Sequence, residues 1–195
     1  LDYPYSNLFR ALEVSVNDLD PQYRNRYLDL AAFPEDTIVP LEALETFWEP
    51  EGLNKFDVSD LTDEFINRSL ARSGGNGLTL HDLQYDFVRS QGGDLKALHR
   101  RLLDAYGKKC PNGWPSGPDD GYFFQHLAYH LSGAGLLEDL KSLLLDFNWI
   151  RSKLDACHET NLLVSDYDFA QPQEDNDIRL LQKAIRFSAN VLNHD

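Results

Sequence analysis

The stretch SLARSGGNGLTLHDLQYDFVRSQ, residues 69–91, decides the fold of the first part of this chain. Its glycine-rich centre, Ser73–Asn76, lies between two short runs that favour strands, so it predicts a β-hairpin with its tip at these residues. The second run ends at His81 and Asp82, and the helical pattern LQYDFVRSQ follows directly. The elements before this hairpin therefore determine which fold class it belongs to.

Helical patterns precede the hairpin over residues 6–16, 20–33, 40–48 and 57–70. The start of the second is the clearest, because Asp20 is a good N-cap and Pro21 occupies the first helical position. Several helices followed by a two-stranded hairpin is the order of a winged helix. We therefore expect a winged-helix domain over residues 1–106.

The rest of the chain, residues 107–195, is predicted to be purely helical. A loop rich in proline and glycine covers residues 110–120, and helical patterns with short connections follow it. The acidic segment 165–177 is predicted to be a surface loop. The predicted fold class is mainly α: a winged-helix domain with a small β-hairpin, followed by an all-α helical arm or bundle.

The charge of the chain argues against the DNA-binding role that a winged helix suggests. The formal net charge is −14, and residues 1–90 hold 17 acidic side chains against 7 basic ones. The helix before the hairpin would be the recognition helix, yet residues 57–70 carry four carboxylates and one arginine. Duplex binding requires lysines and arginines that neutralise phosphates. We expect no nucleic-acid partner.

A metal site is the next candidate. His126 and His130 stand four residues apart in HLAYH, so one helical face presents both, with Asp119 and Asp120 nearby in sequence. The zincin motif requires Glu directly after the first histidine, and here the residue is Leu127. A zinc site needs three or four placed ligands. We favour an aromatic-rich core helix whose histidines form local hydrogen bonds.

Nothing in the sequence supports catalysis by this chain. It holds no nucleophile elbow and no phosphate-binding loop, and neither Cys110 nor Cys157 stands in a catalytic motif. The two cysteines are far apart, and we interpret them as reduced, intracellular thiols. No apolar run approaches the ~18 residues of a membrane span, so no membrane partner is expected. The lack of any methionine indicates part of a longer protein.

An ionisable pair, His81 and Asp82, stands where the hairpin meets its helix. Asp82 is predicted to be the N-cap, with its carboxylate accepting from N–H groups of the first turn. An imidazole beside the positive end of a helix can contact an anion. The alternative is that His81 only ends the strand and bonds a nearby carbonyl, and local chemistry alone favours this alternative.

Three runs in the first part resemble the winged-helix domain of the apoptotic protease-activating factor family of NB-ARC signalling ATPases: residues 26–48 (RYLDLAAFPEDTIVPLEALETFW), 61–70 (LTDEFINRSL) and 78–91 (LTLHDLQYDFVRSQ). Residues 117–154 (GPDDGYFFQHLAYHLSGAGLLEDLKSLLLDFNWIRSKL) resemble the helical arm that follows it. The resemblance implies that His81, in the family's LHD motif, reaches the β-phosphate of bound ADP. Ser69, in NRSL, is the counterpart of a serine that approaches the same nucleotide.

The resemblance also implies a function. The chain is expected to be a regulatory, non-catalytic fragment that holds no cofactor alone and acts as a lid on ADP, in a missing upstream nucleotide-binding domain that binds ADP or ATP. Its implied partners are that domain, a downstream WD-repeat propeller or similar sensor, and other subunits of an oligomeric ring in the cytoplasm. The alternative is a stand-alone helical adaptor for protein–protein interactions, since helical arrays bind partners on concave faces.

Overall fold

The computed structural model describes residues 6–170 and 175–192. The chain divides into two compact units, residues 1–98 and 99–195, hereafter the first and second units. The division falls inside helix α6 (Leu95–Gly107), which also contains the predicted boundary between residues 106 and 107. That boundary stays a prediction. Within the described residues, no helix is both long and apolar enough to cross a bilayer.

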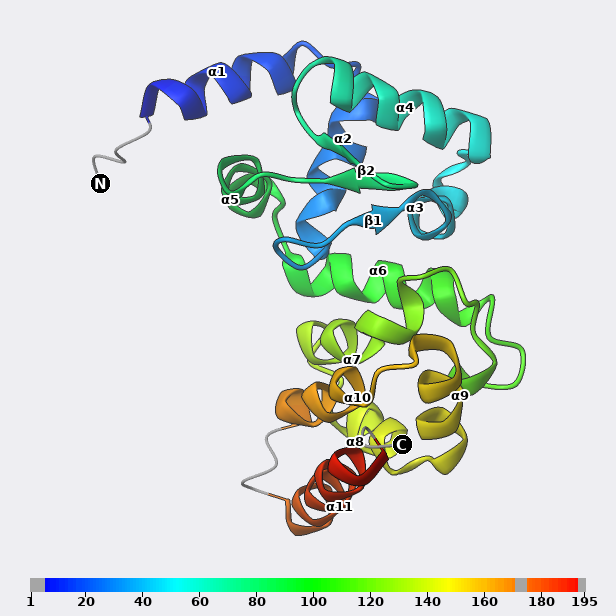
Figure 1. The fold of residues 1–195 in the computed structure, drawn as a ribbon. Coiled ribbons are helices and arrows are strands. Elements are labelled where there is room, and N and C mark those ends of the chain that lie inside the picture. The colour runs from blue at the N-terminus through cyan, green and yellow to red at the C-terminus, as the bar shows by residue number, and fades with distance from the viewer. Residues whose placement is uncertain (1–5, 171–174, 193–195) are drawn as a thin grey trace. The chain divides into compact units, whose positions relative to one another are not determined.

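In the described residues of the first unit, five helices lie around a small sheet (Figure 1). These helices are α1 (Ser6–Asn17), α2 (Pro21–Asp29), α3 (Leu41–Trp48), α4 (Lys55–Asn67) and α5 (Asp82–Gln91), with 3-10 turns at Leu30–Ala32 and Glu49–Glu51. Figure 1 shows α2 passing behind the sheet. The cap predicted for α2 is confirmed, because the Asp20 carboxylate accepts from the N–H of Gln22 at 2.9 Å.

The sheet has three antiparallel strands in the order β1-β3-β2, formed by Val39–Pro40, Gly77–Thr79 and Arg72–Gly74. The predicted hairpin of β2 and β3 is confirmed, and β1 joins it on the far side of β3. A side chain at Gly77 would overlap the Val39 carbonyl, so this pairing requires glycine.

Helix α4 begins at Lys55, two residues before the predicted start, because Asn54 is its cap. The Asn54 side chain accepts from the N–H of Phe56 at 2.8 Å, and the carboxylate of Asp57 accepts from the Asn54 N–H at 2.9 Å, forming a capping box.

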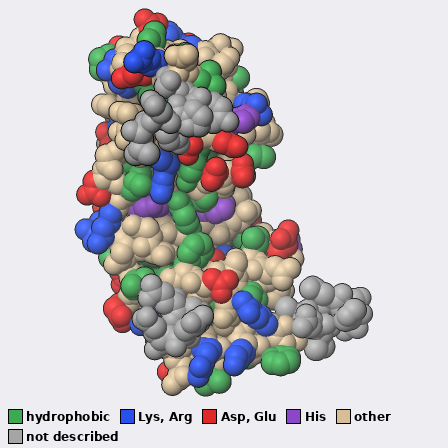
Figure 2. All heavy atoms as spheres, turned by 90° about the vertical axis from the view of Figure 1, so that its left-hand side faces the viewer, with side chains coloured by type: hydrophobic (Ala, Val, Ile, Leu, Met, Phe, Trp, Pro, Cys, Tyr) green, Lys and Arg blue, Asp and Glu red, His purple; other side chains and the backbone are tan. Residues whose placement is uncertain are grey.

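Helix α4 exposes its acidic side chains, and Arg68, which follows the helix, pairs with Asp18 and Glu64. Figure 2 shows acidic and basic side chains mixed on the face that it draws.

A buried tyrosine connects α2 to the segment after α4. The hydroxyl of Tyr27 donates to the carbonyl of Leu70 at 2.9 Å, and its ring packs edge-on against Phe65 at 5.2 Å. Tyr27, Phe65 and Leu70 are all fully buried. The chain direction at residues 68–71 is therefore fixed from the core of the unit, which matters for the pocket described below.

The second unit is helical throughout its described residues. Besides α6, its helices are α7 (Phe123–Gly133), α8 (Leu137–Leu145), α9 (Phe147–Cys157), α10 (Thr160–Asp166) and α11 (Asn176–Leu192), with 3-10 turns at Trp114–Ser116 and Tyr167–Ala170. The core centres on Trp149, whose indole stacks on Phe124 at 5.3 Å and meets the edge of Phe123 at 5.9 Å. The predicted combination of a winged helix and a helical bundle is confirmed.

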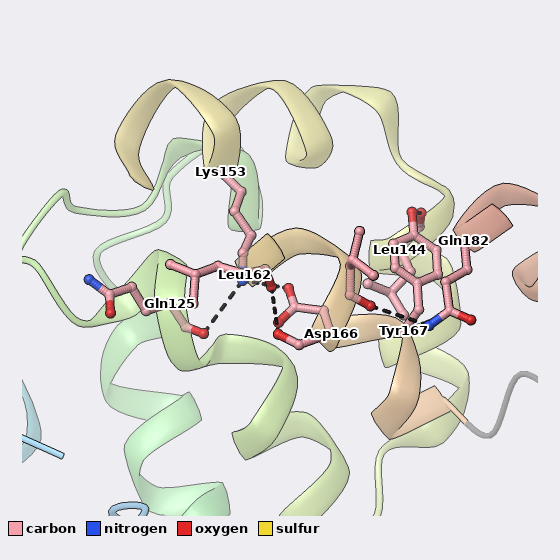
Figure 3. Close-up of polar contacts among 9 residues, drawn as sticks. Gln125, Leu144, Lys153, Leu162, Asp166, Tyr167 and Gln182 are labelled. Carbon is pink, nitrogen blue, oxygen red and sulfur yellow. Dashed lines mark hydrogen bonds and ion pairs between the residues drawn. The ribbon is translucent and has the colours of Figure 1, made fainter. Parts of the chain in front are cut away.

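The prediction of a surface loop over residues 165–177 is wrong for its first part. Asp166 ends α10, and both Asp166 and Tyr167 are buried. Lys153 from α9 is also fully buried, and its ammonium donates to the Asp166 carboxylate at 2.6 Å and to the Gln125 carbonyl at 3.4 Å (Figure 3). Residues 171–174 lie outside the described residues.

Replacing Lys153 tests this buried pair. Burial raises the pKa of Asp166 to about 7, and the adjacent ammonium opposes that shift. We expect Lys153→Met to lower the free energy of unfolding by about 3–5 kcal/mol, because it leaves a buried carboxyl without a counter-charge. The loss relative to the wild type should grow as the pH rises above about 7, because Asp166 then ionises beside the ammonium in the wild type but keeps its proton in the folded variant, whose pKa lies higher without Lys153. Urea unfolding at several pH values measures both effects.

The double variant Lys153→Met with Asp166→Leu should recover most of the lost stability and the pH dependence. Lys141→Met is the matched control, since Lys141 pairs with Glu138 and Asp175 near the surface and should contribute less than about 1 kcal/mol. Equal losses in the Lys153 and Lys141 variants would contradict a special role for the buried pair.

Candidate functional site

The first unit contains an open pocket of about 530 Å³ between α1, the end of α4, β2 and the start of α5. Both residues singled out by the resemblance, His81 and Ser69, line it. The complete lining is Leu8, Leu12, Ile66, Ser69, Ala71, Arg72, His81, Leu83 and Gln84. Its apolar residues come from α1, α4 and α5, and its polar residues come from the chain segments on either side of the hairpin. The pocket suits a ligand with a charged end.

His81 is the N-cap of α5, and the prediction that Asp82 caps this helix is wrong. His81 has extended backbone angles, and its carbonyl accepts the first helical bond from the N–H of Tyr85 at 2.8 Å. Asp82 is already helical, so its carboxylate projects from the first turn with three quarters of its side chain exposed. It lies 3.7 Å from Nδ1 of His81. The imidazole is about half exposed, at 48%, and accessible to a ligand.

The side-chain amide of Gln84 connects His81 to Ser69. Its Oε1 accepts from the backbone N–H of His81 at 2.8 Å, and its Nε2 donates to the carbonyl of Ser69 at 2.6 Å. One planar amide therefore links the backbones of the two predicted residues. Sequence reasoning missed Gln84. The pattern of a cap followed three residues later by Gln would have identified it if His81 had been taken as the cap.

Ser69 turns the chain at the end of α4 with a left-handed backbone angle, φ +59°. This conformation costs a non-glycine residue roughly 1–2 kcal/mol. Two hydrogen bonds hold this turn: the N–H of Ser69 donates to the carbonyl of Ile66 at 2.9 Å, and the N–H of Leu70 donates to the carbonyl of Phe65 at 2.8 Å. Together with the bond from Tyr27 to Leu70, they direct the exposed Ser69 toward the pocket.

His130 of α7 belongs to the core of the second unit, as the favoured interpretation predicts, whereas His126 is half-buried beside the ring of Tyr122. His130 is buried, with its Nε2 at 2.7 Å from the Tyr122 hydroxyl and its Nδ1 at 2.9 Å from Nδ1 of His99. Burial lowers the pKa of His130 well below its usual value and that of His126 to about 4. In the part of the chain that the structure describes, no three His, Cys, Asp or Glu side chains are grouped to hold a metal.

The two cysteines are both free thiols. Burial raises the pKa of Cys110 to about 11, and burial is also the main cause that raises the pKa of Cys157. A thiol becomes nucleophilic only as the thiolate, so these environments disfavour nucleophilic chemistry. The pocket at His81 is therefore the strongest candidate site of the described residues.

Two family models match successive parts of the chain. Residues 22–88 match the winged-helix domain described as apoptotic protease-activating factor 1-like, and residues 95–191 match the APAF-1 helical domain. The pocket lies in the first of these regions for all but its two α1 residues.

Relatives span both animals and plants. Apoptotic protease-activating factor 1 of Danio rerio is 31% identical over 172 residues, which are 85% of this chain and 13% of the relative. The Rattus norvegicus protein of the same name is 28% identical over 95% of this chain and 15% of its own length. Disease resistance protein ADR1 of Arabidopsis thaliana is 44% identical over 64% of this chain and 18% of its own length. This chain spans less than a fifth of each relative, and it belongs to the apoptotic protease-activating factor family, of which it carries the winged-helix and helical domains.

Proposed function

We propose that this chain is the regulatory, non-catalytic part of an NB-ARC signalling ATPase. Its first unit acts as a lid on ADP that an upstream nucleotide-binding domain holds, with His81 contacting the β-phosphate and Ser69 lying beside it. The observation that carries this proposal is that His81 and Ser69 line one open pocket and are joined through Gln84. The register of the hairpin brings the two residues near each other, and the Gln84 amide links their backbones.

The position of His81 suits contact with a phosphate. It precedes the first turn of α5, where unpaired N–H groups and the helix dipole favour an anion. Its imidazole is accessible, and its backbone is anchored by Gln84. A lid of this kind stabilises the closed state only by the difference in affinity for ADP between the closed and open states. Exchange of ADP for ATP would remove that difference and release the surfaces used in ring assembly.

The second unit would link this switch to a C-terminal sensor, such as a WD-repeat propeller, in a cytoplasmic protein. Apoptosis is the process named for the animal relatives. The alternative, a helical adaptor, is favoured by Phe147 at the start of α9, which exposes 73% of its surface, and by Leu145 beside it at 50%. Such exposed apolar side chains can contact a protein partner in either role.

The lid role can be tested in the full-length protein that contains the upstream domain. We expect His81→Ala to speed ADP release by about 10-fold or more, because a hydrogen bond to a charged group contributes about 1.5–3 kcal/mol. Release of a fluorescent ADP analogue measures the rate, and light scattering measures the oligomeric state. His158→Asn is the control, since His158 lies in the second unit with a left-handed φ of 54° that asparagine tolerates. An unchanged rate for His81→Ala would disprove the lid.

The Gln84 connection makes a separate prediction in the same protein. Gln84→Ala should speed ADP release, but by less than His81→Ala does, because the imidazole remains while its anchor is lost. In the His81→Ala background the same change should have almost no effect, since residues that act as a unit are not additive. Gln91→Ala, at the exposed end of α5, is the control. Additive effects of the two substitutions would show that Gln84 acts independently of His81.

A further inference from the structure

A cationic side chain, Arg72, lines the pocket that also holds His81. We propose that Arg72 binds the terminal phosphate of a nucleoside diphosphate together with His81, so that the ligand's charge is held from two sides. This inference rests on the proposed function and extends it to a residue that the resemblance does not single out.

The hairpin places Arg72 close to His81. Arg72 opens β2 and pairs with Thr79 at the end of β3, and only Leu80 separates Thr79 from His81. The strand register therefore puts Arg72 at the same open end of the hairpin as the imidazole. Ser69 lies three residues before Arg72, so the polar residues of the pocket all come from the two chain segments that enter and leave the hairpin.

The guanidinium of Arg72 is also available. Among the described residues it makes no hydrogen bond or ion pair, and its side chain is exposed. Four other arginines of the first unit bond carboxylates or backbone carbonyls, namely Arg24, Arg26, Arg68 and Arg89. No nearby carboxylate of the described chain therefore neutralises the guanidinium of Arg72, although residues 1–90 hold 17 acidic and 7 basic side chains. This guanidinium supplies positive charge where the pocket opens.

The chemistry of the two groups is complementary. A guanidinium presents a planar set of donors that matches two oxygens of one phosphate, and it stays charged at every physiological pH. The imidazole and the start of α5 approach from the neighbouring segment. The other side of the pocket is formed by Leu8, Leu12 and Leu83, which offer no competing acceptor side chains. A phosphate is the anion class that suits this pair of donors.

The test measures release of a fluorescent ADP analogue from the full-length protein carrying Arg72→Ala, Arg72→Lys or Arg10→Ala. Arg10, an exposed arginine of α1 outside the pocket lining, is the matched control. We expect Arg72→Ala to release ADP about 10-fold faster, Arg72→Lys to lie between it and the wild type, and Arg10→Ala to be unchanged. The difference between Arg72→Ala and wild type should shrink at high salt.

The outcomes separate this inference from the lid proposal. If His81→Ala releases ADP faster and Arg72→Ala does not, Arg72 has no role and the lid stands. If both are unchanged, the lid proposal fails and the role of Arg72 fails with it. Equal acceleration by Arg72→Ala and Arg10→Ala would also overturn the inference, because it would show a general effect of charge. Thermal unfolding of each variant without nucleotide, expected to match the wild type, excludes a folding defect as the cause of faster release.

Discussion

The proposed site depends on one side-chain amide. Gln84 accepts from the N–H of His81 and donates to the carbonyl of Ser69, so it joins the start of α5 to the end of α4. Without this connection the two segments would be related only through the hairpin between them. Ser69 is further held by the left-handed turn after α4, which the buried Tyr27 supports through Leu70. Contacts that begin in the core, at Tyr27 and Leu70, therefore hold Ser69 in place, and Gln84 links Ser69 to His81.

Local signals explain how much of the fold could be predicted from the sequence. The cap at Asp20 and the glycines of the hairpin tip act within a few residues, and the structure confirms both. The pairing of β1 with β3 was not predicted, because it depends on a close approach of Val39 to Gly77 that no local pattern reveals. The cap of α5 was misplaced by one residue because Asp is a commoner cap than His. The backbone angles of His81 are extended and identify it as the N-cap. Gln84 then stands three residues after the cap, at the position from which its side chain bonds the N–H of the cap residue.

The second unit shows why an acidic composition does not by itself place residues 165–177 on the surface. An acidic segment usually belongs to the surface, since burying a carboxylate is costly unless it is paired. Here the partner, Lys153, lies 13 residues earlier on α9, and both side chains are almost completely buried. Sequence shows that a lysine and an aspartate exist but not that two helices bring them together. The same holds for Arg72 and His81, which only the register of the hairpin places at one end of the sheet.

The distribution of charge also suggests how the first unit would discriminate between anions. A long polyanion such as duplex DNA would meet the exposed carboxylates of α4 and few basic side chains to offset them, which disfavours binding. A single diphosphate delivered by a neighbouring domain would meet only the pocket, where Arg72 and His81 stand next to apolar side chains. Specificity of this kind arises from repulsion outside the site as much as from attraction within it. In the proposed lid role, the acidity of the winged helix would disfavour the binding of other polyanions near the pocket.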